Sequence, residues 1–182
     1  ALEPLREIAA QAGGAIADLV APGPYPRLLV GPEGPPMAMR NRSFFADDLD
    51  ESTAADLLTA LETSTAMMRA VQLRVLGGAV ADVPADATAF AHRDAAITGV
   101  VAVAEQSSAE VARHAGWVSD LADRLRAGRA GAYVNFVPDG DPARLADAYP
   151  GETGRRLAEL KAVYDPHNLF RGNLNVPPAR GS

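Results

Sequence analysis

Apolar residues recur at helical spacing in four stretches of the chain. The first begins at Pro4, and Gly13 and Gly14 mark a break within it. The later stretches have capping residues before the first turn, or a glycine or proline after the last turn. Helices are therefore expected at Pro4–Val20, from a cap at Asp50 or Ser52 to Ser64, from a cap at Ser107 or Ser108 to Ala127, and at Gly151–Val163.

Other stretches alternate between apolar and polar residues, or are continuously apolar, as strands are. Ala70–Leu76 places Gln72 and Arg74 on one face and apolar residues on the other, which predicts a half-buried strand. The β-branched run Thr98–Ala104 is apolar on both faces and predicts a central strand. Further strands are expected at Arg27–Val30, Met39–Phe45, Ala79–Val83 and Ala132–Val137.

The remaining segments connect these elements. Residues 31–36 are rich in Pro and Gly and predict a loop, and Asp141 followed by Pro142 is a further helix start. Asn168–Pro178 has no period and predicts an extended tail. About four or five strands mixed with four helices favour an α+β fold, in which an antiparallel sheet has helices packed on one face.

Composition and charge narrow the function. The chain has 182 residues, of which 48% are hydrophobic and 22% charged, as in an ordinary globular domain. Its net charge is −6, which argues against nucleic acid as a partner because phosphate binding needs a basic surface.

Several kinds of site and location are disfavoured. The chain has no cysteine, and its three histidines, His92, His114 and His167, have no metal-ligand spacing, so no metal site is expected. No apolar run approaches the ~20 residues of a membrane span, so no membrane association is expected. Localisation stays open, with the cytoplasm favoured.

The most specific signal lies between Tyr133 and Pro178. The sequence reads Y-V-N-F, then G-E-T-G-R-R-L, then K-A-V-Y-D-P-H-N-L-F, then N-V-P-P. This order resembles the C-terminal signature of the berberine-bridge-enzyme-like FAD oxidases of the vanillyl-alcohol-oxidase type. The matching residues are Tyr133, Asn135, Gly151, Glu152, Arg156, Leu157, Lys161, Tyr164, Asp165, Pro166, Asn168, Phe170, Pro177 and Pro178.

The resemblance extends upstream to the Gly-Gly at 77–78 and to the segment T-A-F-A-H-R at 88–93. It implies that residues 1–130 are the substrate-binding α+β portion, whose sheet roofs the flavin. Residues 131–182 are then the berberine-bridge-type C-terminal segment, and the two together form one compact domain.

The resemblance also implies an FAD-binding domain that this chain lacks. The sequence has neither a G-x-G-x-x-G loop nor a Gly-Gly-His-Ser loop, and without cysteine a two-point covalent flavin link is impossible. We therefore expect FAD in the intact enzyme, no cofactor bound to this chain alone, and a separate FAD-binding domain as its partner.

The catalytic base is the main departure from the family pattern. The second aromatic residue of the Y-x-N-Y motif is often the base, and here it is Phe136, which has no proton to exchange. Tyr133 is the remaining phenol and the candidate catalytic residue. Alternatively another residue serves as base, the hydride transfer needs little base, or the protein is not an active oxidase.

Cofactor-binding candidates come from three segments. Asn135 is a polar residue in an apolar stretch and needs a partner, such as the flavin. His92 is a candidate proton relay, and Arg93 a candidate for stabilising reduced flavin, with an ion pair to Asp94 or Asp86 as the structural alternative.

Two further groups of residues complete the candidate site. In the tail, Asn173 and Asn175 are candidates to meet the cofactor domain. Gln72, Arg74 and Phe136 are the candidate substrate-facing residues, with exposure to solvent as the simpler alternative for the first two.

Two functions fit this sequence. One is the C-terminal substrate-domain part of an FAD-dependent oxidoreductase that transfers hydride from an alcohol or amine carbon of a small molecule to flavin, inactive alone. The other is a stand-alone, non-catalytic domain that binds a small molecule or a protein. In either case an exposed sheet face favours self-association.

Overall fold

The chain forms two units, Ala1–Pro35 and Pro36–Ser182, which are described separately. The assignment of residues 1–130 and 131–182 to two family segments stays a prediction. The computed structural model describes residues 2–15, 17–18, 20–26, 36–137, 141–172 and 174–180.

The first unit contains the helix α1 (Glu3–Gln11), with a proline in its first turn. The predicted extension of this helix to Val20 is wrong because the backbone turns at Gly13 and Gly14, where φ is +99° and +94°. The predicted strand at 27–30 and residues 31–35 of the predicted loop lie outside the described residues.

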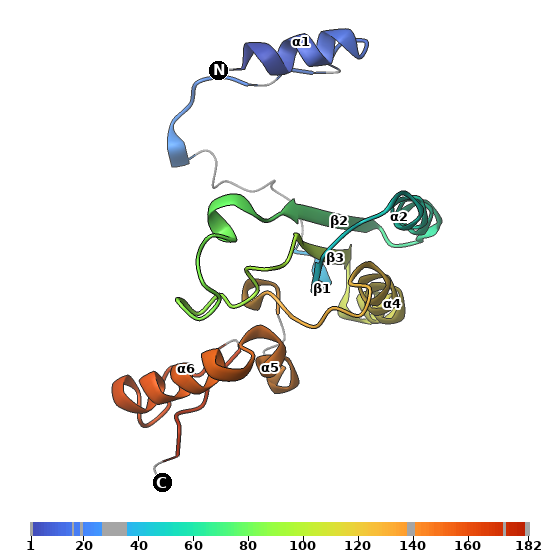
Figure 1. The fold of residues 1–182 in the computed structure, drawn as a ribbon. Helices are drawn as coiled ribbons and strands as arrows, with labels where there is room; N and C mark the ends of the chain where they lie inside the picture. The colour runs from blue at the N-terminus through green and yellow to red at the C-terminus, as the bar shows by residue number, and fades with distance from the viewer. Residues whose placement is uncertain are drawn as a thin grey trace. The chain divides into compact units, whose positions relative to one another are not determined.

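The second unit is built on a three-stranded antiparallel sheet of β1 (Ala38–Ala46), β2 (Met68–Val75) and β3 (Ile97–Glu105). The strand order is β1-β3-β2, so the β-branched run forms the central strand as predicted (Figure 1). Among the described residues there are fewer strands than the four or five expected.

β2 confirms the strand predicted at Ala70–Leu76, although its predicted half-burial and its predicted continuation are wrong. The predicted half-buried strand is almost wholly exposed, with Val75 87% exposed, because it lies at the sheet edge. The predicted continuation at Ala79–Val83 is wrong, since Gly77 and Gly78 have positive φ and the 3₁₀ helix η2 (Gly78–Val80) follows.

Two helices follow the expected caps. Asp50 caps α2 (Glu51–Thr63) by accepting a 2.7 Å hydrogen bond from the Thr53 N–H. Ser107 caps α3 (Ser108–Arg113), which is separated from α4 (Ala115–Leu125) at His114.

The predicted single helix from Ser107 to Ala127 is therefore wrong in its middle. The N–H of His114 donates to the Val111 carbonyl three residues back, at 3.0 Å, which tightens the turn. The His114 imidazole also pairs with the Glu105 carboxylate at the end of β3, 3.0 Å away. Periodicity continues through this point, but the helix does not.

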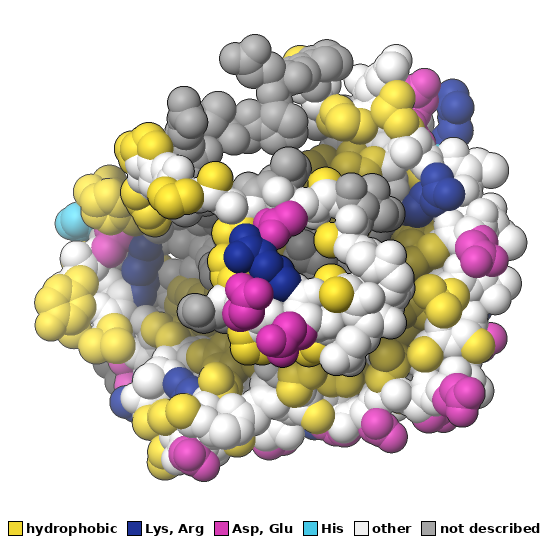
Figure 2. Space-filling view, turned by 90° about the horizontal axis from the view of Figure 1, so that it is seen from above, with side chains coloured by type: hydrophobic (Ala, Val, Ile, Leu, Met, Phe, Trp, Pro, Cys, Tyr) yellow, Lys and Arg dark blue, Asp and Glu magenta, His cyan; other side chains and the backbone are white. Residues whose placement is uncertain are grey.

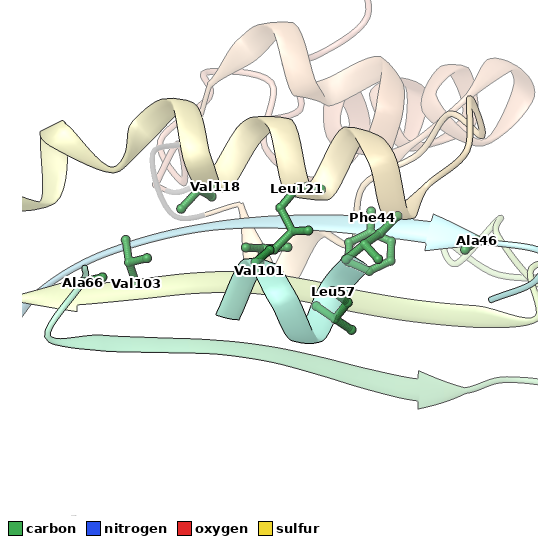
Figure 3. Packing of buried hydrophobic residues seen from close by; sticks show 11 residues of the cluster. Phe44, Ala46, Leu57, Ala66, Val101, Val103, Val118 and Leu121 are labelled. Atoms are coloured by element: carbon green, nitrogen blue, oxygen red, sulfur yellow. The ribbon is translucent and has the colours of Figure 1, made fainter. Parts of the chain in front are cut away.

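The core lies between one face of the sheet and the helices, as predicted. Figure 3 shows Val118 and Leu121 of α4 pointing toward the strands beside Phe44 and Val101. A Cβ atom at Gly99 would lie 2.3 Å from Cζ of Phe44, so glycine is needed where the ring crosses β3. The buried cluster comprises Phe44, Ala46, Leu57, Ala60, Ala66, Val101, Val103, Val118, Leu121, Ala122 and Leu125.

The C-terminal segment contains the 3₁₀ helices η3 (Val134–Phe136) and η4 (Pro142–Arg144), then α5 (Leu145–Ala148) and α6 (Gly151–Tyr164). The predicted strand at 132–137 is wrong. Its backbone bonds locally, because the Phe136 N–H donates to the Tyr133 carbonyl at 2.8 Å.

The described part of the tail is extended, as predicted, and runs back along α6 (Figure 1). The Asp165 carboxylate accepts hydrogen bonds from the N–H groups of Leu169 and Phe170, at 2.8 and 3.0 Å. Further along, the Ala179 N–H donates to the Ala158 carbonyl of α6 at 2.9 Å. The motif residues thus hold the tail to its own helix.

Charge and hydropathy add two observations. Figure 2 shows basic and acidic side chains interspersed on the face it displays. None of the described helices is both long enough and apolar enough to cross a bilayer.

Candidate functional site

The sheet face opposite the helices carries the candidate site, and we call it the open face. Side chains alternate along a strand, so the partners of the core residues point to this side. The antiparallel register pairs Ser43 with Val100 and Gln72 with Val100, which places all three on the open face. Its polar members are Asn41, Ser43, Gln72, Arg74 and Thr98.

The 3₁₀ helix η3 is tied to the open face through Tyr133. Its N–H donates to Oγ of Ser43, 3.1 Å away on β1. The Tyr133 hydroxyl in turn accepts a 2.9 Å hydrogen bond from the Asn135 side-chain amide. Both motif residues therefore lie beside the sheet, with the phenol ring half-buried and the amide exposed.

The aromatic rings of η3 meet the polar residues of β2. The rings of Tyr133 and Phe136 are edge-to-face with centroids 5.4 Å apart. The Arg74 guanidinium lies 5.2 Å from the Phe136 ring centroid, and its Nη2 donates to Oε1 of Gln72 at 3.3 Å. All three predicted substrate-facing residues are thus near Tyr133.

Arg93 lies on the other side of the same ring system. Its guanidinium is 5.6 Å from the centroid of Phe90, and Phe90 is edge-to-face with Tyr133 at 6.0 Å. The guanidinium donates to the Val80 carbonyl at 3.0 Å and to Thr88 Oγ1 at 2.7 Å.

The structural alternative for Arg93 was an ion pair with Asp94 or Asp86, and it is wrong for the arrangement seen here. Asp94 pairs instead with Arg129, at 2.7 Å. Asp86 offers its backbone carbonyl to Arg156, at 2.6 Å.

His92 is buried behind the site, with 8% of its surface exposed. Its ring stacks on Phe45 at 4.3 Å, and its Nε2–H donates to the Asp147 carbonyl at 2.8 Å. Burial lowers the pKa of His92 below the usual 6.5, so the ring is neutral at pH 7. These contacts join β1 to the segment before α6.

A hollow of about 490 Å³ opens between the end of β2 and the aromatic rings. It is lined by Arg74, Phe90, Arg93, Thr98 and Tyr133 together with apolar residues of 75–80. Phe90 and Thr98 were not among the predicted site residues, although Phe90 belongs to the T-A-F-A-H-R motif. The strand alternation that selected Gln72 and Arg74 also applies to Thr98.

The tail residues remain apart from this cluster. Asn175 is half-buried, and its Oδ1 has no hydrogen-bond partner among the described residues. Asn173 lies outside the described residues. Within the described ranges, no three His, Asp or Glu side chains are arranged to hold a metal ion.

Comparison with known proteins identifies relatives of this chain. The family described as "Berberine and berberine like" matches residues 132–177. "Uncharacterized FAD-linked oxidoreductase YgaK" of Bacillus subtilis is 33% identical over 84% of this chain and 34% of its own length. "FAD-linked oxidoreductase sorD" of Penicillium rubens is 29% identical over 78% of this chain and 31% of its own length.

Solved structures show the same fold. BBE-like #28 from Arabidopsis thaliana superposes over 97% of this chain and 40% of its own, with a TM-score of 0.70 and 16% identity. The glycopeptide hexose oxidase DBV29, solved with teicoplanin, covers 81% of this chain and 34% of its own, with a TM-score of 0.65 and 26% identity. The chain spans about a third of the length of the curated relatives named above. With its motif, fold and relatives in agreement, the chain belongs to the berberine bridge enzyme-like family of FAD-linked oxidoreductases.

Proposed function

We propose that this chain supplies the substrate-facing part of an FAD-dependent oxidoreductase, which oxidises an alcohol or amine carbon of a small molecule by hydride transfer to flavin. The observation that carries the proposal is the cluster on the open face. Gln72 and Arg74 come from β2, and Tyr133, Asn135 and Phe136 from a segment about sixty residues later, yet their side chains form one contact network.

The residues of the open face fit a flavin ring. Two of its side-chain oxygens, Asn41 Oδ1 and Thr98 Oγ1, are buried without a hydrogen-bond partner among the described residues. A buried polar atom without a partner is costly, and the polar edge of a bound ring would relieve that cost. FAD, when bound, supplies the hydride acceptor.

We assign Asn135 to holding the cofactor. One N–H of the Asn135 amide donates a hydrogen bond to the Tyr133 hydroxyl, so its second N–H and its carbonyl are available to a ligand. The sequence also suggests Arg93 for stabilising reduced flavin, but its guanidinium lines the hollow beside β2, and we assign it to the substrate instead. We assign His92 to positioning, because its ring packs under Phe45, and Asn173 and Asn175 to the contact with the cofactor domain.

Tyr133 is our candidate for moving the substrate proton. Its hydroxyl oxygen accepts from Asn135, which leaves its own O–H to be donated or exchanged. Phe136 has no such proton and shapes the pocket through its contact with Arg74. General acid–base groups of this kind contribute roughly 10²–10⁴-fold to a rate.

The partner is a separate FAD-binding domain, and a row of exposed apolar residues favours it. Met39 and Met68 pair with opposite sides of Ala104 on the open face and are 58% and 41% exposed. Such a row favours contact with a partner surface. In the chain alone the same row favours self-association, which light scattering at increasing concentration measures.

An absorption and complementation experiment tests the function. The chain is mixed with FAD and desalted, first alone and then with the isolated FAD-binding domain of the B. subtilis relative. We expect no retained flavin band with the chain alone, since it lacks a pyrophosphate-binding loop. With the added domain, we expect substrate-dependent bleaching that Tyr133→Phe slows by about 100-fold or more.

Two results would contradict the proposal. A flavin band retained by the chain alone would show that it holds FAD unaided. Equal bleaching rates for the unmodified chain and Tyr133→Phe would remove Tyr133 from the chemistry.

A stand-alone binding domain is the second candidate, and Phe136 at the position of the family's base favours it. The two functions differ in what precedes residue 1. A coding sequence with a Gly-Gly-His-Ser loop upstream supports the oxidoreductase, whereas a start codon directly before residue 1 supports the stand-alone domain.

A further inference from the structure

The hollow beside β2 contains two arginines and no acidic side chain. Arg74 and Arg93 approach it from different segments, and the remaining lining residues are apolar, aromatic or hydroxyl-bearing. The chain as a whole has a net charge of −6, so a basic hollow departs from its average.

Neither arginine is neutralised by a partner in the described structure. Arg74 donates to the amide oxygen of Gln72, and Arg93 donates to a backbone carbonyl and to a threonine hydroxyl. Some other arginines bond only to backbone carbonyls, as Arg69 does, but six among the described residues are paired with carboxylates. Arg129 pairs with Asp47 and Asp94, for example, and Arg155 with Glu152 and Glu159.

Both guanidinium groups are also held over aromatic rings. Arg74 lies over Phe136 and Arg93 over Phe90, with the Tyr133 ring between these two phenylalanines. Stacking fixes the plane of a guanidinium and leaves its N–H edge to receive an oxyanion. The rings themselves offer flat apolar surface to the body of a ligand.

We propose that this hollow binds a substrate that carries a carboxylate beside a planar apolar body, and that Arg74 and Arg93 determine this specificity. The carboxylate lies between the two guanidinium groups, and the planar body lies against Phe90 and Tyr133. This assignment rests on the proposed function, because it names the substrate class of the same site.

Binding of simple probes to the full-length chain tests the assignment without flavin. The probes are 2-naphthoate, its neutral analogue 2-naphthylmethanol, and 2-naphthyl phosphate, titrated at pH 7.5 and followed by NMR shifts of ¹⁵N-labelled protein. At that pH the carboxylate is fully ionised. We expect 2-naphthoate to bind at least about tenfold tighter than 2-naphthylmethanol, as charge-assisted hydrogen bonds allow.

Variants separate the two arginines from general charge. Arg74 is exposed, so Arg74→Gln is expected to fold and to lose about tenfold in naphthoate affinity, with naphthylmethanol unchanged. Arg93→Gln should act in the same direction. The matched control is Arg113→Gln, at an exposed position on α3, which packs against the other face of the sheet, and it should leave both affinities unchanged.

Several outcomes overturn the assignment. Equal affinities for naphthoate and naphthylmethanol, no binding of either probe at 10 mM, or an equal loss in Arg113→Gln would each exclude a carboxylate site here. Tighter binding of 2-naphthyl phosphate than of 2-naphthoate would replace the carboxylate by a phosphate. A failed flavin complementation together with selective naphthoate binding would refute the proposed function and leave this site standing.

Discussion

Gly131 lies at the entry to the aromatic cluster, and replacing it by alanine should be strongly destabilising. Its φ is +133°, a conformation that residues with a side chain rarely adopt. An added Cβ atom would lie 2.8 Å from Cε1 of His92 and 2.8 Å from Cδ2 of Phe45. Those rings are buried and stacked on each other, so neither can move without opening their contact.

The expected loss follows from two contributions. Backbone strain at such a φ costs about 1–3 kcal/mol, and forcing a methyl group into a filled core costs about 1–3 kcal/mol more. We therefore expect Gly131→Ala to lower the free energy of unfolding by about 4 kcal/mol, a large share of the ~5–15 kcal/mol of a typical domain.

Two other glycines serve as controls. Gly128 has a φ of +85° and open space around its Cβ position, so Gly128→Ala carries the strain without the contact. Gly116 lies within α4 with open space and ordinary backbone, so Gly116→Ala should stabilise the chain by roughly 0.5 kcal/mol. Urea unfolding followed by Trp117 fluorescence measures all three, since Trp117 packs against the core.

The comparison between Gly131→Ala and Gly128→Ala decides the argument. If the two variants lose the same free energy of unfolding to within about 0.5 kcal/mol, which is close to the resolution of such measurements, then the added methyl group at position 131 does not crowd His92 and Phe45. If Gly131→Ala loses more, combining it with His92→Ala should recover part of the difference by removing the ring that the methyl group meets.

Three further predictions concern single groups. Burial lowers the pKa of His92 from its ordinary 6.5, so the contribution of His92 to stability is complete above pH 6.5 and declines as the pH falls toward the folded-state pKa. Urea midpoints measured between pH 8 and 5 should show this decline, and the decline should be smaller in His92→Phe. Thr98→Val removes a buried hydroxyl that has no partner among the described residues, so the free energy of unfolding of the chain alone should rise by about 1 kcal/mol. A lower melting temperature in thermal denaturation would contradict that. Hydrogen bonds, chiefly from a lysine of α6, hold the pKa of Asp165 below its usual value, so the stabilising effect of this carboxylate is present at neutral pH and lost as the pH falls through the folded-state pKa. Asp165→Asn should speed amide hydrogen exchange at Leu169 and Phe170 but not in β3.

Sequence predicted best the elements whose pattern has a single interpretation. The run 98–104 is rich in β-branched residues and nearly all apolar, and it forms the central strand with a neighbouring strand on each side. Asp50 and Ser107 precede helical periods and accept hydrogen bonds from the first turn, as capping requires. In each case the local pattern and the tertiary environment favour the same structure.

Prediction failed where a distant partner decided the local structure. His114 fits the helical period, yet its imidazole pairs with Glu105 at the end of β3, and the helix divides there. The alternation of 70–76 predicted burial of Leu73 and Val75, but no neighbouring strand or helix covers that end of β2 among the described residues. Both errors concern contacts that a single segment cannot reveal.

The error at 132–137 matters most for the site. In a strand, Tyr133 and Phe136 would point to opposite faces, because side chains alternate with a period of two. In the 3₁₀ turn that forms instead, residues three apart lie above one another, and the two rings meet at 5.4 Å. Sequence alone therefore proposes candidate residues for the site but does not predict their arrangement.

That arrangement also gives the Phe136 ring a contact with β2. The Phe136 ring meets Tyr133 edge-to-face and has the Arg74 guanidinium over its own face, and Arg74 and Tyr133 line the same hollow. Phe136→Leu should then weaken naphthoate binding in the same direction as Arg74→Gln, because it frees the guanidinium without removing its charge. An unchanged affinity in Phe136→Leu would mean that Arg74 needs no ring beneath it, and the aromatic cluster would then be structural only.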